Sequence, residues 1–319
     1  MVQISGTNLR FLQTDVVLSE IMRVMEPNLK FIDVLPFVDS GGQPVTYGLK
    51  GSRSADSKKQ LPRMKTPSSR FPEVEITRMT KATVLTKQEG LAIRFDKDAL
   101  KLPAGKDMIM DAYQTVGYWL AEAMNTGIYT TIRAGGTDAG MTPTAVWSAA
   151  GATPFEDLRN FKNGMKREGY AYRMTDAYVE MTNYNELESY LATVDITDMQ
   201  RLKIFGLPTL NQDVVNIPLV GDVHGVFSGV THGDLLGLDR NNRTAASVYY
   251  NNDPDFGTPS AIDFDTVING VVTAKTVPNF GLTTHQYFED DTHDTVVQLW
   301  YDNVIAVKDP YGIIYDNGL

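Results

Sequence analysis

The 319-residue sequence contains no cysteine, and this absence excludes several classes of site together. Without thiols the chain has no cysteine nucleophile, no thiolate metal ligand and no disulfide. Packing, or contact with a partner, must therefore hold the fold together. No apolar stretch approaches the roughly 20 residues that a membrane-spanning helix requires, so we expect no membrane insertion. Residues 1–5 have neither a cationic region nor an apolar run, so we expect no secretory signal. We therefore expect the protein to be made in a cytoplasm.

Histidine is scarce. The chain has only four, His224, His232, His285 and His293. The last two bracket the acidic residues 289–291, a combination that suits hard cations. No metal-binding spacing such as H-E-x-x-H is present, and an acidic surface turn accounts for the same residues. We predict no catalytic, cofactor-binding or metal-binding residue, while a metal-dependent α/β hydrolase that uses residues 285–294 stays open as an alternative of a different class.

Two other enzyme motifs are missing. The glycine-rich residues 134–140 follow an expected helix, whereas a phosphate-binding loop follows a strand and opens a helix. We interpret them as a helix stop and linker. Ser228 lacks the G-x-S-x-G frame of a nucleophile elbow. The sequence therefore predicts a protein that is not an enzyme.

Charge is distributed unevenly along the chain. Residues 50–87 carry ten Lys or Arg against three acids, a net charge of +7, and because the whole chain is −10 the remainder is −17. The acidic total argues against general binding of nucleic acid. Phe71 in the basic stretch and Tyr47 just before it are the only rings there for base stacking, whereas single-strand binders usually combine charge with several aromatics.

Three interpretations of the basic stretch stay open: a solvated loop, a nucleic-acid contact, and a contact with a neighbouring copy of the acidic chain. We favour the third, because the stretch has little apolar surface of its own and opposite charge steers assembly. The candidate residues for contact between subunits are Arg53, Lys58, Lys59, Arg63, Lys65 and Arg70.

Periodicity predicts a long hairpin followed by a long helix. Apolar residues alternate at the two ends of residues 41–88, as in paired strands. Residues 107–133 then repeat apolar positions at steps of three and four. Asp107 is a plausible N-cap and Arg133 lies in the last turn, where each charge suits the helix dipole. Gly135 and Gly136 supply the stop.

The rest of the chain alternates between helix and strand and then becomes mostly strand. Thr153 and Pro154 open a helix that runs to Arg167, and a strand over 177–181 leads into a second helix capped by Asn183. Strands are expected over 245–250 and 261–273, and a long strand over 295–307 is stopped by Asp309 and Pro310. The pattern predicts an α+β fold.

This order of parts resembles the major capsid proteins of tailed double-stranded DNA viruses, which have the Hong Kong 97-type fold that encapsulin shells share. Residues 178–183 resemble the axial-domain strand and helix of that family, residues 206–208 its glycine-proline turn, and residues 304–313 its closing strand and Asp-Pro turn. The resemblance implies five segments: an N-terminal arm (1–40), an extended E-loop hairpin (41–88), a peripheral domain (89–150) with a spine helix (107–133), a mainly axial α/β domain (151–290), and a C-terminal strand that returns to the peripheral domain (291–319).

The resemblance also implies a function. We expect a structural subunit of the virion capsid that assembles in the host cytoplasm into pentamers and hexamers of an icosahedral shell around double-stranded DNA. The implied partners are other copies, a separate scaffold, portal and accessory capsid proteins, and DNA held by non-specific contact. We expect no cleaved scaffolding segment of the kind that some relatives carry, which implies a separate scaffold or none. Lys58, Lys59 and Lys65 have no assignable partner for covalent cross-linking. An encapsulin-type cargo shell is the alternative within the same fold.

Overall fold

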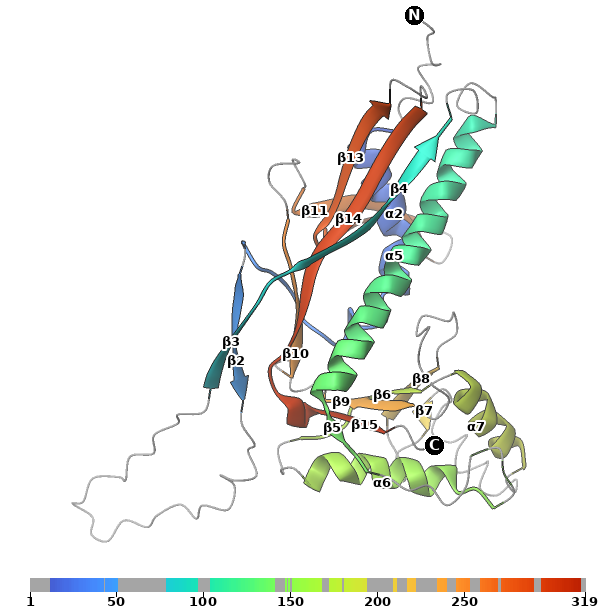
Figure 1. Cartoon of the computed structure of the whole chain (residues 1–319). Helices are drawn as coiled ribbons and strands as arrows, with labels where there is room; N and C mark the ends of the chain where they lie inside the picture. Colours follow the sequence, from blue (N-terminus) through green and yellow to red (C-terminus); the bar gives the residue numbers. More distant parts are fainter. Residues whose placement is uncertain are drawn as a thin grey trace, which may run out of the picture. The chain divides into compact units, whose positions relative to one another are not determined.

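Figure 1 shows the computed structural model of the chain. The structure describes residues 12–42, 44–50, 79–96, 104–140, 147, 149, 151–167, 172–179, 181–193, 209–210, 217–221, 234–239, 245–252, 259–268, 271–289 and 294–316. The chain divides into two compact units. The first unit comprises Met1–Val45, Thr83–Ile128 and Val248–Ala306, and the second comprises Thr46–Ala82, Tyr129–Ser247 and Val307–Leu319. Helices and strands are mixed in both, so the predicted α+β class is confirmed.

The longest element is α5 (Gly105–Gly135), a helix of 31 residues that spans about 46 Å at 1.5 Å per residue. The predicted helix over 107–133 is therefore confirmed, and it ends at Gly135 as expected. Asp107 is not the N-cap, because the helix begins two residues earlier, but its carboxylate still lies in the first turn beside the positive end of the dipole. Arg133 lies in the last turn.

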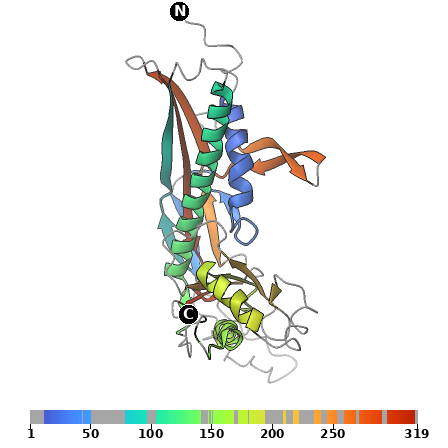
Figure 2. The ribbon, with the colours of Figure 1, turned by 90° about the vertical axis from the view of Figure 1, so that its right-hand side faces the viewer.

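A shorter helix, α2 (Thr14–Asn28), packs against α5 in the first unit, and Figure 2 shows the two side by side. Its buried face is formed by Val17, Leu18, Ile21, Met22 and Met25. The helices meet closely at Gly117, where an added Cβ would lie 3.0 Å from the carbonyl oxygen of Ile21. The glycine therefore sets how near the two backbones come.

One sheet supports both helices of the first unit. Its strands are β1 (Phe37–Asp39), β10 (Ala246–Tyr250), β14 (Asp294–Val307), β13 (Leu282–Glu289) and β4 (Lys87–Phe95). The central strand is β14, which pairs antiparallel with both β13 and β4 and confirms the long strand predicted over 295–307. The ring of Phe95 on β4 packs edge-on against Tyr113 of α5, with centroids 6.0 Å apart. The sheet and the long helix thus share one core.

The single strand predicted over 261–273 is wrong. Two strands, β11 (Ala261–Ile268) and β12 (Val271–Pro278), pair antiparallel with Ile268 opposite Val271. The two residues between them in the sequence are Asn269 and Gly270, the pair that tight hairpins favour, so the signal for a turn was present. The hairpin is tied to α2 by an ion pair of 2.6 Å between Lys275 and Glu26.

The second unit contains a sheet with two helices. Its six strands, in spatial order, are β5 (Thr137–Asp138), β15 (Ile313–Asp316), β9 (Leu235–Leu238), β6 (Asp176–Val179), β8 (Ile217–Gly221) and β7 (Thr209–Leu210). The helices α6 (Pro154–Arg167) and α7 (Met181–Thr193) confirm the two predicted after residue 151. Because α7 begins at Met181, Asn183 lies inside the helix and is not its N-cap, and the strand predicted over 177–181 ends at Val179. Leu158, Phe161 and Met165 of α6 are buried in the core of this unit, as the apolar spacing predicts.

Two further details concern the ends of strands. The flanks of the predicted hairpin pair as β2 (Val45–Lys50) and β3 (Met79–Val84), which confirms a two-stranded arrangement there.

After β14, Pro310–Gly312 form the short 3₁₀ helix η2, so the predicted break at Asp309 and Pro310 is confirmed. The boundaries of the five predicted segments stay a prediction.

Candidate functional site

The basic stretch is described only at its ends. All six predicted contact residues, Arg53, Lys58, Lys59, Arg63, Lys65 and Arg70, lie outside the described residues. At the described C-terminal end, Lys81 and Lys87 are exposed on either side of Leu85, whose side chain is 64% exposed. This end of the stretch therefore offers cationic and apolar surface together.

The long helix carries an exposed surface of the opposite charge. Tyr118 and Trp119, adjacent in the middle of α5, are 55% and 56% exposed, although large aromatic side chains are usually well buried. Asp111 is exposed and Glu122 half-buried near them. The sequence analysis missed this surface because it considered only the apolar positions that repeat at steps of three and four in residues 107–133. The signal that could have revealed it was two large aromatic residues, Tyr118 and Trp119, outside those positions.

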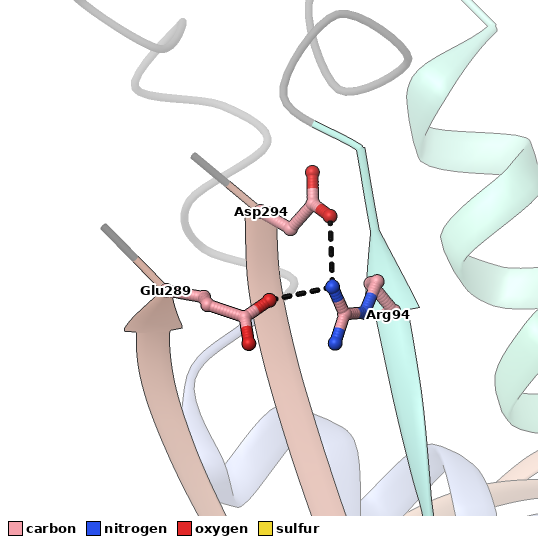
Figure 3. Close-up of polar contacts among 3 residues, drawn as sticks. All are labelled: Arg94, Glu289 and Asp294. Atoms are coloured by element: carbon pink, nitrogen blue, oxygen red, sulfur yellow. Dashed lines mark hydrogen bonds and ion pairs between the residues drawn. The ribbon is translucent and has the colours of Figure 1, made fainter. Parts of the chain in front are cut away.

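A second charged cluster joins three strands of the first unit, and Figure 3 shows it. Arg94 of β4 lies between two carboxylates, with its Nη1 2.5 Å from Oε2 of Glu289 and 3.4 Å from Oδ2 of Asp294. Glu289 is directly opposite Asp294 in the pairing of β13 with β14. The guanidinium therefore links the end of β13 to the start of β14 and the end of β4.

This cluster gives no support to the metal-dependent hydrolase. His285 precedes Glu289 by four residues on β13, which places their backbones about 13 Å apart at 3.3 Å per residue. Glu289 and Asp294 are paired with Arg94, and the remaining members, residues 290–293, lie outside the described residues. Within the described part of the chain, no group of three or more His, Asp or Glu side chains is placed to hold a metal ion.

Removal of the Arg94 side chain is expected to have a small effect. An Arg94→Ala variant loses two ion pairs of a guanidinium that is about half exposed, so the free energy of unfolding should fall by less than about 1 kcal/mol. Urea unfolding at low and high salt measures this, and the difference from wild type should shrink with added salt. A loss several times larger would mean that the three strand ends depend on this cluster.

A buried phenol links β14 to β4. The hydroxyl of Tyr301 donates a hydrogen bond of 2.6 Å to the carboxylate of Glu89. Burial raises the pKa of Tyr301 above its ordinary value, and the adjacent negative charge of Glu89 raises it further. Burial alone also raises the pKa of Tyr113. The folded state therefore holds these protons more tightly than the unfolded chain does.

Stability is expected to fall in alkali for this reason. The unfolded chain releases tyrosine protons near pH 10 while the folded chain retains them, so the free energy of unfolding declines as pH rises above about 10. A Tyr301→Phe variant should show a shallower decline. Urea unfolding of both proteins between about pH 8 and 11 compares the slopes. Equal slopes would show that Tyr301 does not contribute to the pH dependence.

The end of α5 is fixed by a buried ion pair inside the second unit. Arg133 lies 2.9 Å from the carboxylate of Asp234, whose side chain is fully buried just before β9. The guanidinium also lies over the ring of Tyr315 on β15, 6.0 Å from its centroid. Burial and the charge of Asp234 raise the pKa of Tyr129, one turn earlier on the helix. The sequence placed Arg133 at a helix end but offered no signal for Asp234 as its partner.

None of the helices in the described part of the chain combines the length and apolar character needed to cross a bilayer.

The described architecture has the Hong Kong 97-type fold, so the fold expected from the order of elements is confirmed. The virus-like particle protein from Pyrococcus furiosus aligns with 95% of this chain and 98% of its own, at a TM-score of 0.55 and 9% identity. An encapsulin from Synechococcus elongatus aligns with 93% of this chain and 89% of its own, at a TM-score of 0.51 and 8% identity. The capsid protein of cyanophage P-SCSP1u aligns with 90% of this chain and 87% of its own, at a TM-score of 0.50 and 11% identity. No protein-family profile and no curated protein sequence matches the chain.

Proposed function

We propose that this chain is a structural subunit that assembles with copies of itself into a closed icosahedral shell. The observation that carries the proposal is the fold: a virus-like particle protein, an encapsulin and a phage capsid protein resemble the chain over almost its whole length. The alignments cover 90–95% of this chain and therefore include most of both compact units. Similarity across both units favours a shared architecture over a chance likeness of one motif.

Within this class, we propose that the chain is the major capsid subunit of a tailed double-stranded DNA virus. The subunit would assemble in the host cytoplasm and form the pentamers and hexamers of the virion. Residues 41–88 would form the E-loop, residues 89–150 the peripheral domain and residues 151–290 most of the axial domain. The +7 charge of residues 50–87 supports a role for this loop against an acidic neighbour. A separate scaffold, a portal, accessory proteins and packaged DNA are the partners that belong to this role.

An encapsulin-type cargo shell is the second candidate, supported by the similarity to the encapsulin at a TM-score of 0.51. The two differ in content, DNA in one and a cargo enzyme in the other. Expression of the chain in a bacterium, alone and with its neighbouring genes, followed by electron microscopy of the purified material, tests both. Closed shells support the shell function, and their contents decide between the candidates. Monomers that persist under all conditions of salt, pH and crowding would contradict it.

Reversal of the loop charge should impair assembly without unfolding the subunit. In a variant with Arg53→Glu, Lys58→Glu, Lys59→Glu and Arg63→Glu, the net charge of residues 50–87 changes from +7 to −1. Attraction to an acidic neighbour then becomes weak repulsion. We expect a circular dichroism spectrum like that of wild type and a much lower yield of shells by sedimentation. Normal shells from this variant would refute the electrostatic role of the loop.

A further inference from the structure

One side of α6 packs on the sheet of the second unit, and Figure 1 shows the helix running along it. Leu158, Phe161 and Met165 lie in the core of that unit. Gly164 brings the helix close to β15, because an added Cβ would lie 2.9 Å from Cδ1 of Ile314. These contacts fix the rotation of the helix, so its remaining positions form a surface that the core does not use.

The outward side of α6 carries cationic and amide side chains. Arg159 and Asn160 are exposed, and Asn163, one turn after Arg159, is half-buried. Lys162, also half-buried, borders them. These four residues, Arg159, Asn160, Lys162 and Asn163, are here called the α6 face. The exposed acid Glu156 lies in the first turn, where the helix dipole favours a negative charge, and residues 158–167 contain no further acid.

Positive charge is concentrated in this helix. Residues 158–167 contain four Lys or Arg, whereas residues 108–319 contain only 12 in 212 positions. The helix dipole accounts for cations in the last turn. It does not account for Arg159, which lies in the second turn. The α6 face is therefore a compact cationic surface on a chain whose net charge is −10.

A surface of this composition fits the phosphate backbone of duplex DNA. Arg and Lys neutralise phosphates, and Asn amides donate hydrogen bonds to phosphate oxygens. Arg159 and Asn163 are about 6 Å apart along the helix axis, close to two phosphate steps of about 3.4 Å on one strand. With one negative charge per about 1.7 Å, duplex DNA also offers a denser row of anions than the dispersed carboxylates of a protein surface. The face has no aromatic ring for stacking, so it suits a duplex more than a single strand.

We propose that the α6 face contacts the phosphate backbone of double-stranded DNA packaged in the shell. The inference rests on the proposed capsid function and assigns the contact with DNA to one surface of the second unit. It also gives the two basic regions of the chain different partners, a neighbouring copy for residues 50–87 and DNA for α6. Because phosphate contacts carry no sequence information, the contact is independent of the bases.

Acetylation of lysine amines tests where the DNA lies. DNA-filled shells, obtained by expression with the neighbouring genes, are treated with an acetylating ester before and after release of their DNA, and mass spectrometry measures the rate at each lysine. We expect Lys162 to react several-fold more slowly while DNA is present. Lys81 and Lys87, exposed at the end of the basic stretch, are the controls and should react equally in both.

Two outcomes of this experiment would overturn the proposal. Lys162 that is equally slow in filled and emptied shells, but faster in the unassembled subunit, would show that a neighbouring copy covers the face. Lys162 that reacts equally in all three would show a face covered by solvent alone.

Charge reversal separates contact with DNA from contact between subunits. We expect Arg159→Glu with Lys162→Glu to form shells in normal yield by sedimentation. On heating, these shells should release a several-fold larger share of their DNA to nuclease than wild type, because the new carboxylates repel phosphate. The matched variant, Lys81→Glu with Lys87→Glu, makes the same change of charge in the basic stretch. It should show the reverse, a lower yield of shells with normal retention of DNA in each.

A low yield of shells with normal retention in the α6 variant would assign the face to a neighbouring copy and overturn the proposal. Normal yield and normal retention would overturn it too. If circular dichroism shows that the α6 variant is poorly folded, Asn160→Asp adds one negative charge at an exposed position and should lower retention in the same direction.

The two proposals fail in distinguishable ways. Shells that package DNA but leave Lys162 equally reactive before and after its release would overturn the α6 face and leave the capsid function intact. Protein that forms no shells, or shells that enclose a cargo protein in place of DNA, would contradict the capsid function, and the assignment of α6 would fall with it.

Discussion

A Gly90→Ala variant is expected to be strongly destabilised, with a loss on the order of 3 kcal/mol or more in the free energy of unfolding. Gly90 lies on β4 directly opposite Trp300 of β14. A Cβ at this position would lie 2.2 Å from the carbonyl oxygen of Leu299 and 2.5 Å from Cβ of Trp300. The first of these is a backbone atom of the central strand and cannot move aside alone. A methyl group must therefore push β4 away from β14.

Gly127→Ala is the matched control, because it adds the same methyl group where nothing lies within 4 Å. Gly127 lies inside α5, and alanine is a better helix former than glycine by about 1 kcal/mol. The two substitutions should thus shift the urea midpoint in opposite directions, downward for Gly90→Ala and slightly upward for Gly127→Ala. A Gly90→Ala protein as stable as wild type would mean that β4 does not pair with β14 at this register.

The second large effect is expected at Asn125, a fully buried polar residue of α5. Its side-chain oxygen accepts a hydrogen bond of 3.0 Å from the backbone N–H of Lys30, and its amide donates one of 2.8 Å to the carbonyl of Asn28. Both backbone groups belong to the end of α2 and the turn after it. In an Asn125→Leu variant, the N–H of Lys30 and the carbonyl of Asn28 both lose the hydrogen bond to residue 125.

The expected loss for Asn125→Leu is about 2–3 kcal/mol, since each of the two partly buried backbone groups left without a hydrogen bond costs on the order of 1 kcal/mol or more. The readout is urea unfolding followed by amide hydrogen exchange, in which the last turn of α2 should lose protection first. Gln114→Ala, an exposed position on the same helix, is the control and should change stability by less than about 0.5 kcal/mol. A loss for Asn125→Leu no larger than that of the control would argue against this link between the helices.

The elements that the sequence predicted correctly are those whose pattern is local and strong. The helix over 107–133 combines repeated apolar spacing with glycines at its end, and the structure has it as Gly105–Gly135. Thr153 and Pro154 mark the start of a helix in the same way. The long strand before Asp309 and Pro310 is a run of β-branched and aromatic residues with a clear stop. These elements could be predicted from the sequence because residues close together in the chain determine them.

The errors also have physical reasons. The strand predicted over 261–273 is a hairpin, since Asn269 and Gly270 outweigh the continuous β propensity around them. Asp107 was predicted as the N-cap because of its residue type, but α5 begins at Gly105. The exact ends of a helix are less sharply defined than its middle, and they vary by one or two residues. The predicted contact residues Arg53 to Arg70 lie outside the described residues and stay a prediction.

The sequence by itself determined the class of fold, the long helix and the separation of a basic stretch from an acidic remainder, because periodicity and charge are properties of the chain's order. Only the tertiary structure decided which distant residues meet. Asn125 binds the end of α2 about a hundred residues earlier, Gly90 lies against Leu299, and Arg94 joins Glu289 and Asp294. Such contacts depend on strand register and helix rotation, which no local pattern specifies. The exposure of Tyr118 and Trp119 also became visible only when the structure showed which side of α5 the core leaves uncovered.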